Sequence, residues 1–220
     1  MDLARSPLFI VFDGMDGTGK TTQMRLLAER LSAEGIPVEL TAEPTDMEDG
    51  RRRRRLRSGK EIATNSEIAT LFLLDRITHN THPERGINRR LDDGVTVLCD
   101  RYYYSSIAYQ GIGESFEWVA HMNLDCPDVR RPDGCIFFDM DPAASMARIR
   151  AGRSDDALEI YETVAQQERI RARYARVRDY LADRECICTV DADGTVEEVA
   201  DRVWEAYEII RRAHETQKND

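Results

Sequence analysis

Short apolar runs alternate with amphipathic stretches along this chain of 220 residues. The apolar runs predict strands at residues 8–13, 38–41, 95–99, 135–139 and 186–190. Because nearly every position in these runs is apolar, they are typical of parallel strands that are covered on both faces. We therefore expect them to lie side by side in the interior of one sheet.

The stretches between the runs carry apolar residues at spacings of three and four, which is the periodicity of a helix with one buried face. Three such faces stand out: Ile170, Tyr174, Val177 and Leu181; Val196, Val199, Val203, Tyr207 and Ile210; and Ile68, Leu71, Phe72, Leu74 and Ile77. The alternation of strands and helices predicts an α/β fold, a doubly wound five-stranded parallel sheet flanked by helices. The chain has no internal repeat and no linker, so we expect a single domain over residues 1–220.

Charge and composition exclude several classes of partner. The chain has 31 Lys and Arg residues against 41 Asp and Glu residues, a net charge of −10, so we expect no nucleic-acid partner and no anionic membrane. No apolar run approaches the roughly 18 residues of a membrane span, and the first residues do not resemble a signal peptide, so we expect a cytoplasmic protein. The five cysteines lack metal-ligand spacing and are expected to be reduced thiols.

The clearest chemical motif follows the first predicted strand. The segment GMDGTGKT, residues 14–21, matches the phosphate-binding pattern G-x-x-x-x-G-K-S/T between a strand and a helix. Its glycines let backbone N–H groups point inward at phosphate oxygens, while Lys20 reaches the β- and γ-phosphates and the Thr21 hydroxyl can bind Mg²⁺. We therefore predict an ATP site with Mg²⁺ that is formed by Gly14, Met15, Asp16, Gly17, Thr18, Gly19, Lys20, Thr21 and Thr22.

A phosphate-binding loop does not identify the molecule that receives the phosphate. The chain has no N-K-x-D element of the kind that reads guanine in signalling GTPases, and it is too short for a motor or helicase core. Small-molecule kinases remain. Asp100 closes the third predicted strand, at the sheet edge where such folds bind ligands, so it is predicted to hold Mg²⁺ while the adjacent Arg101 clamps an acceptor phosphate.

Four segments resemble the thymidylate kinase family, in that family's order and over essentially the whole chain. They are FDGMDGTGKTTQ around the phosphate-binding loop, TAEPT at 41–45, ATLFLLDR at 69–76 and DRYYYSSIAYQG at 100–111. The resemblance implies transfer of the ATP γ-phosphate to dTMP, giving dTDP for DNA precursor synthesis. Two alternatives stay open: a related kinase with a different pyrimidine acceptor, and a nucleotide-binding module without catalysis.

The resemblance also implies an acceptor site. Phe72 and Arg76, four residues apart on one helix, correspond to residues that stack on thymine and hydrogen-bond its carbonyl edge. Without the resemblance, Phe72 would be interpreted as a core residue. The segment after the third strand would be interpreted as the ordinary start of a helix. With it, that segment is predicted to contact the base and sugar through Ser106, Tyr109 and Gln110. Asp16 is implied to position the sugar 3′-hydroxyl.

A lid is expected around residues 148–158, where arginines follow the fourth strand. Gly17 stands where one subtype of the family has a catalytic arginine, so the positive charge is expected from the lid, with Arg153 acting in the transition state and Arg148 lying nearer adenine. Tyr161 is implied to cover the acceptor site. Together these readings make Asp16, Lys20, Arg101 and Arg153 the predicted catalytic residues.

Two departures from the family remove positive charge from the site. Ala42 replaces the arginine of the usual R-E-P segment, and Ile160 replaces another arginine after the lid. The run of arginines at 51–55 is either a solvated surface or a partial replacement in which Arg54 turns inward to the acceptor phosphate. The apolar face around Ile68 and Phe72 resembles the family's dimer surface, so we expect a homodimer.

Overall fold

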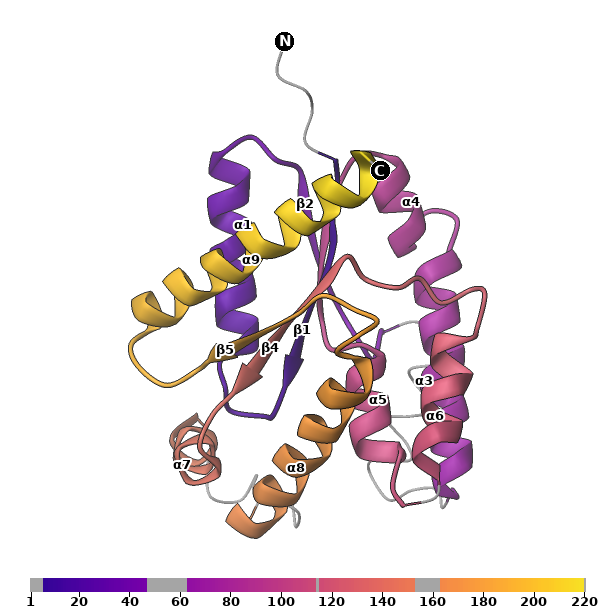
Figure 1. Ribbon diagram of the computed structural model, residues 1–220, viewed down its shortest axis with the longest axis vertical. Coiled ribbons are helices and arrows are strands. Elements are labelled where there is room, and N and C mark those ends of the chain that lie inside the picture. The colour runs from indigo at the N-terminus through magenta and orange to yellow at the C-terminus, as the bar shows by residue number, and fades with distance from the viewer. Residues whose placement is uncertain (1–5, 47–62, 114, 153–162, 220) are drawn as a thin grey trace.

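The computed structural model describes residues 6–46, 63–113, 115–152 and 163–219. Within these ranges, five strands form one parallel sheet in the order β2-β3-β1-β4-β5 (Figure 1). The strands are β1 (Phe9–Gly14), β2 (Val38–Ala42), β3 (Thr96–Asp100), β4 (Gly134–Asp139) and β5 (Ile187–Asp191). Each boundary lies within one residue of its predicted position, so the five-stranded parallel sheet is confirmed.

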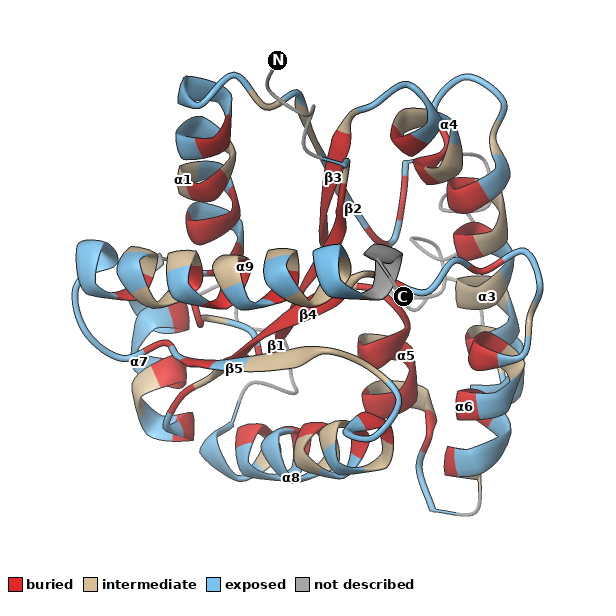
Figure 2. Cartoon of the chain, turned by 45° about the horizontal axis from the view of Figure 1, so that its top comes forward, coloured by how far each residue is buried: buried red, intermediate tan, exposed pale blue. Residues whose placement is uncertain are grey.

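Helices flank the sheet on both faces, which confirms the doubly wound fold (Figures 1 and 2). Helices α1 and α9 pack against each other over one face, and α5 packs against β1 and α8 on the other. The helices of the described ranges are α1 (Lys20–Ala33), α3 (Asn65–Thr81), α4 (Ile87–Asp92), α5 (Tyr103–Gln110), α6 (Ser115–Leu124), α7 (Pro142–Gly152), α8 (Val164–Leu181) and α9 (Val196–Asn219).

The predicted helix faces differ in how far they are buried. On α8, Ile170, Tyr174, Val177 and Leu181 are all buried, as are four of the five predicted residues on α9. The fifth, Val196, is 49% exposed because it opens the helix, before α9 reaches the sheet.

Helix α3 departs from the predicted pattern. Its buried residues are mostly polar, namely Asp75, Arg76, His79 and Asn80 together with Ala69. Its apolar face is only partly covered, and Leu74 is 44% exposed. The apolar periodicity located the helix correctly but did not identify the side that packs inward.

Strand order brings the carboxyl ends of β1 and β3 together. In the register of the sheet, Phe12 of β1 pairs with Asp100 of β3, and Gly14 pairs with Phe138 of β4. β1 and β3 thus lie side by side inside the sheet, and the chain leaves β1 for β2 on one side but leaves β3 for β4 on the other. Ligands of doubly wound sheets bind at such points.

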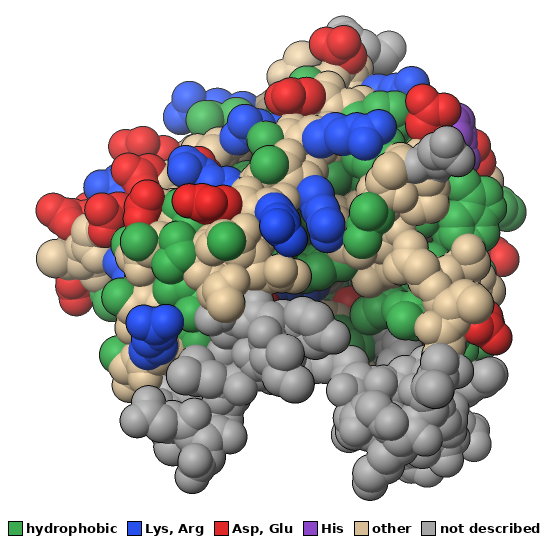
Figure 3. Space-filling view, turned by 90° about the horizontal axis from the view of Figure 1, so that it is seen from below, with side chains coloured by type: hydrophobic (Ala, Val, Ile, Leu, Met, Phe, Trp, Pro, Cys, Tyr) green, Lys and Arg blue, Asp and Glu red, His purple; other side chains and the backbone are tan. Residues whose placement is uncertain are grey.

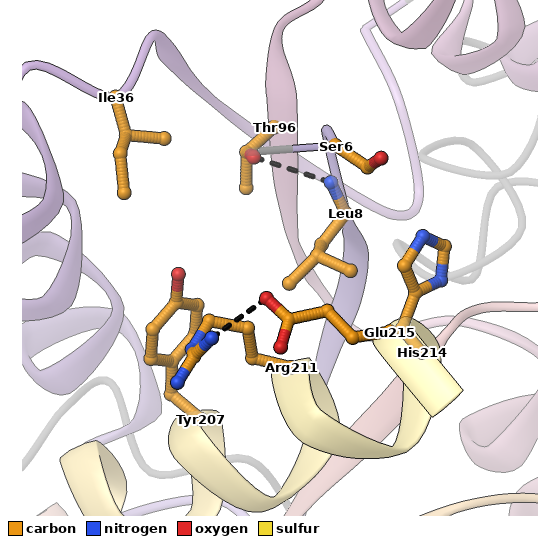
Figure 4. A pocket seen from close by; sticks show the side chains of 8 residues that line it. All are labelled: Ser6, Leu8, Ile36, Thr96, Tyr207, Arg211, His214 and Glu215. Atoms are coloured by element: carbon orange, nitrogen blue, oxygen red, sulfur yellow. Dashed lines mark hydrogen bonds and ion pairs between the residues drawn. The ribbon is translucent and has the colours of Figure 1, made fainter. Parts of the chain in front are cut away.

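At the amino ends of β1 and β3, on the opposite side from these carboxyl ends, the sheet is covered by α9. There Tyr207 and Arg211 of α9 face Leu8, and the Leu8 N–H donates to the Thr96 hydroxyl (3.2 Å, Figure 4). The cavity between them measures about 10 Å³, which is space for one water at most. This edge is therefore packed rather than open to a ligand.

Two further expectations concern cysteines and membranes. All five cysteines are free, as predicted. None of the helices in the described ranges combines the length and apolar character needed to cross a bilayer.

Candidate active site

The loop between β1 and α1 is built on glycine at positions where no other residue fits. Gly17 has φ of 75°, and a Cβ there would lie 2.7 Å from the Ser145 carbonyl oxygen of α7. At Gly14, with φ of 132°, a Cβ would lie 2.3 Å from the Phe138 carbonyl oxygen. The close approach of α7 therefore leaves no room for a side chain at position 17. The arginine that one family subtype has there would not fit.

Lys20 lies at the start of α1 with its ammonium group folded back on the loop. Its Nζ donates to the carbonyl oxygens of Gly14 (3.1 Å) and Met15 (2.5 Å), and the residue is only 6% exposed. Burial, followed by the nearby charge of Arg101, lowers the pKa of Lys20 to about 8. The ammonium group is thus held by two uncharged acceptors that an anionic phosphate oxygen can replace.

The loop lines an open hollow of about 270 Å³ at the carboxyl edge of the sheet. Its lining comprises Asp16, Gly17, Gly19, Lys20, Thr21, Thr22, Asp100 and Arg101. Figure 3 shows this side of the molecule, on whose surface basic, acidic and apolar side chains are mixed. The structure thus brings the predicted phosphate-binding, metal-binding and acceptor-clamping residues into one hollow.

Thr21 and Asp100 meet on the floor of the hollow. The Thr21 hydroxyl donates to Asp100 Oδ2 at 2.6 Å. Both offer oxygen ligands, which Mg²⁺ prefers, and in nucleotide sites Mg²⁺ is held by one or two side chains together with phosphate oxygens and water. Within the described residues there is no group of three or more His, Cys, Asp or Glu side chains that could hold a metal. The pair therefore fits a metal that arrives with a nucleotide.

Arg101 projects toward the loop from a strained backbone. It is the one non-glycine residue of the described ranges with positive φ, at 69°. Its guanidinium donates to Asp16 Oδ1 (2.5 Å), the Ser105 hydroxyl (2.9 Å) and the Tyr174 hydroxyl (3.2 Å). Burial alone lowers the pKa of Arg101, but neighbours that include Tyr174 and Asp16 outweigh it and raise this pKa well above its ordinary value. The guanidinium therefore stays charged.

A second cluster surrounds Arg76 of α3, which is 1% exposed. Its Nε and Nη2 donate to Glu43 Oε2 (2.9 and 2.6 Å), Nη2 also donates to the Ser106 hydroxyl (3.1 Å), and Nη1 donates to Asn123 Oδ1. Glu43 in turn pairs with His79 at 3.0 Å. The predicted acceptor residues Arg76 and Ser106 therefore touch, within a network of buried polar groups.

Three other predicted acceptor residues, Phe72, Tyr109 and Gln110, lie on α3 and α5. The Tyr109 ring centroid is 5.9 Å from the Arg101 guanidinium carbon, whereas Phe72 is half-buried on α3. Gln110 ends α5 with its side-chain oxygen buried and unpaired among the described residues. Arg54 and Tyr161 lie outside the described residues.

Arg148 and the first residues of the predicted lid belong to the end of helix α7 rather than to a loop. The Arg148 guanidinium donates to the carbonyl oxygens of Ala192 (3.0 Å) and Gly194 (3.3 Å), in the loop after β5. Arg153, Ile160 and the arginines at 51–55 lie outside the described residues.

A family model for thymidylate kinase matches residues 12–217. The chain is 38% identical to a probable thymidylate kinase of Pyrococcus abyssi over 197 residues, which covers 87% of this chain and 91% of the relative. It is 37% identical to a probable thymidylate kinase of Thermococcus onnurineus (87% and 93% covered) and 35% identical to a thymidylate kinase of Leptospira borgpetersenii (78% and 81% covered). The chain belongs to the thymidylate kinase family.

Thymidylate kinases are ATP-dependent kinases of nucleoside monophosphates. Two anionic substrates agree with the two predicted phosphate-binding residues, Lys20 and Arg101, in one hollow. Within this family the chain differs at Ala42, where an arginine is usual. The residue that follows, Glu43, is 4% exposed and holds Arg76 from the end of β2. The segment thus orients Arg76, one of the predicted acceptor residues, through the Glu43 carboxylate.

Several residues of the site were missed by sequence reasoning. Glu43, His79 and Asn123 surround Arg76, while Asp13 and Tyr174 lie behind Arg101. Asp13 closes an apolar strand and Tyr174 sits on a predicted core face, so their pattern indicated burial alone. A buried carboxylate requires partners, and that requirement at Asp13 was the available signal.

Proposed function

We propose that this hollow transfers the γ-phosphoryl group of ATP to dTMP, giving ADP and dTDP. An oxygen of the dTMP phosphate attacks the γ-phosphorus, and the bond to the β,γ-bridging oxygen breaks as ADP leaves. The observation that carries the proposal is the position of Arg101 in the same hollow as Lys20. One cation serves each of the two anionic reactants.

The residues of the hollow act by position and charge. The acceptor oxygen is already anionic, so no general base is required, and the rate comes from alignment and from neutralisation of the transferred phosphoryl group. Lys20 exchanges its two carbonyl partners for oxygens of the β- and γ-phosphates. Arg101 holds the acceptor phosphate, and Asp16, its present partner, is released to meet the sugar 3′-hydroxyl.

Mg²⁺ is proposed as the metal, with Thr21 and Asp100 as the residues that hold it. When bound, it supplies charge neutralisation to the β- and γ-phosphates. The proposal is supported by the 2.6 Å contact between the two oxygen-bearing side chains.

The acceptor base is proposed to lie near Arg76, Ser106, Tyr109, Gln110 and Phe72. Four of the five N–H groups of Arg76 donate to oxygens of the described residues, and the second Nη1 hydrogen, which has no partner among those residues, is proposed to meet a base carbonyl. An N–H donor favours thymine or uracil, which offer a carbonyl at position 4, over cytosine, which offers an amino group.

Other proposals concern residues outside the described ranges and the whole chain. We propose that Arg153 is the transition-state arginine, that Tyr161 and Arg54 reach the acceptor, and that residues 148–158 form a mobile lid on a single domain. A homodimer is proposed through α3, supported by the partly exposed apolar residues of that helix. Light scattering should then give twice the chain mass of 25.2 kDa. We also propose a cytoplasmic location.

A panel of acceptors tests the function. Purified protein with ATP and Mg²⁺ is assayed on dTMP, dUMP, UMP, CMP, AMP and thymidine, and dTMP is expected to have the highest kcat/KM. A higher kcat/KM for another pyrimidine nucleotide would move the assignment to that acceptor. ATP binding without turnover of any acceptor would indicate a nucleotide-binding module instead.

A further inference from the structure

A buried tyrosine of α8 lies directly behind the arginine that faces the acceptor phosphate. Tyr174 is 1% exposed, and its hydroxyl oxygen lies 3.2 Å from Arg101 Nη1 and 2.9 Å from Asp13 Oδ1. The Ser105 hydroxyl makes the same two contacts, at 2.9 Å from Arg101 Nη1 and 2.8 Å from Asp13 Oδ1. Two hydroxyls thus connect one guanidinium nitrogen to one buried carboxylate.

The direction of these hydrogen bonds follows from counting protons. An arginine nitrogen can only donate, and a carboxylate that accepts from several groups offers no proton of its own. Asp13 accepts five hydrogen bonds: from the backbone N–H groups of Gly14, Tyr102 and Ser105 and from the two hydroxyls. Each hydroxyl has one proton, which it gives to Asp13 or to the other hydroxyl 2.9 Å away, and its oxygen accepts from Arg101.

Arg101 depends on such contacts for its direction. Its backbone has φ of 69°, a conformation that L side chains rarely adopt, so its own chain segment does not favour this placement. On its other nitrogen, Nη2, the partner is Asp16, whose side chain is 52% exposed. The rigid contacts of the guanidinium are those on Nη1, from Tyr174 and Ser105.

We propose that Tyr174 is a positioning residue for Arg101, holding the guanidinium toward the acceptor phosphate through a hydroxyl that is itself anchored by Asp13 and Ser105. The proposal rests on the proposed function, in which Arg101 binds that phosphate. Tyr174 itself touches neither substrate. When Asp16 releases Arg101 to the acceptor, the contacts on Nη1 keep the guanidinium in place.

The test compares two buried tyrosines of similar burial. Tyr174→Phe removes one hydroxyl that donates to a carboxylate, and the control Tyr104→Phe does the same at Glu185, away from the hollow. Tyr104 is also 1% exposed. Both variants should lose thermal stability, because each leaves a carboxylate a donor short, the buried Asp13 in one case and the half-buried Glu185 in the other.

Of these two tyrosine variants, only Tyr174→Phe should lose activity. We expect kcat/KM for dTMP to fall about tenfold to a hundredfold, the effect of losing a hydrogen bond to a charged group, while the Kd for ATP stays unchanged. Ser105→Ala, a second variant that removes the other acceptor of Arg101 Nη1, should also lower kcat/KM for dTMP. If Tyr174→Phe folds poorly, Ser105→Ala still tests whether the hydroxyls on Arg101 Nη1 hold the guanidinium in place.

A double-mutant cycle with Arg101 separates positioning from a merely structural role. In an Arg101→Lys background the fork-shaped guanidinium is gone, so adding Tyr174→Phe should have little further effect on kcat/KM. Equal losses in both backgrounds would overturn the proposal, as would Tyr174→Phe with wild-type kcat/KM for dTMP. Wild-type protein that does not phosphorylate dTMP would contradict the proposed function as well, whereas an active wild type with an unaffected variant contradicts the role of Tyr174 alone.

Discussion

Lys20, the residue proposed to bind phosphate, lies where its surroundings disfavour its charged form. Burial first and the neighbouring Arg101 second lower the pKa of Lys20 to about 8 in the free protein. Bound phosphates favour the protonated form and raise that pKa again. ATP binding is therefore linked to the protonation of one side chain.

The linkage predicts how ATP affinity changes with pH. Below pH 8 Lys20 is charged with and without ATP, and affinity should be constant with respect to this group. Above pH 8 binding must take up a proton, so the affinity should fall by up to about tenfold per pH unit. Calorimetric titration in two buffers of different ionisation enthalpy would measure both the affinity and the proton uptake. The control is Lys20→Arg, which stays charged throughout; a wild-type profile that stays flat to pH 10 would contradict the pKa shift.

Gly17 and Gly35 form a matched pair that separates backbone strain from crowding. Their φ angles are 75° and 79°, but a Cβ at Gly17 would meet Ser145 and Ile149 of α7, while a Cβ at Gly35 meets nothing within 4 Å. Alanine at either position should cost about 1–2 kcal/mol of backbone strain. Gly17→Ala should lose about 1–3 kcal/mol more through overpacking. Urea unfolding measures both, and equal losses would show that α7 yields at this point.

At the level of single elements, α3 is held by polar contacts where most helices of this fold are held by apolar ones. Its buried Arg76 pairs with Glu43 at the end of β2, and the side chains are 1% and 2% exposed. Removing one member of such a pair leaves an unpaired buried charge, which costs more than the pair itself contributes. The pair joins a helix and a strand that are 33 residues apart along the chain, so its loss should loosen the packing of α3 against β2.

A double-mutant cycle tests this link between α3 and β2. Glu43→Gln and Arg76→Gln should each lower the free energy of unfolding by about 3–5 kcal/mol, and the double variant should lose less than the sum. The exposed pair of Arg89 and Asp93 serves as control, with side chains 55% and 37% exposed. Arg89→Gln should change stability by about 0.5 kcal/mol or less. Additive losses at Glu43 and Arg76 would mean that they do not act as a pair.

For the whole molecule, the net charge of −10 sets the response to salt. Excess negative charge repels itself in the folded state, and salt screens this repulsion. Raising NaCl from about 0.02 to 0.2 M at pH 7 should therefore raise Tm by about 2–4 °C, as expected for roughly 1 kcal/mol in a chain of this size. At pH 5, close to the sequence pI of about 5.0, the effect should vanish. A Tm that falls with salt at pH 7 would show that attractive ion pairs dominate.

Much of the fold could be predicted because its determinants are contiguous. Each strand is a short apolar run, and the phosphate-binding loop needs glycines at fixed spacing. Arg101, Lys20, Thr21 and Asp100 could be placed in one site because their segments end at the same sheet edge. The inward side of α3 could not be predicted, since its buried residues are polar and satisfy one another only after packing.

The sequence by itself determined the order of elements, the phosphate-binding loop and the family, because each is written in neighbouring residues whose backbone and apolar requirements are local. The tertiary structure alone decided which buried polar groups meet. Arg76 finds Glu43 across 33 residues, and Tyr174 finds Asp13 across 161. A buried donor or acceptor must have a partner, but only the packing of strands and helices brings one specific partner within hydrogen-bonding distance.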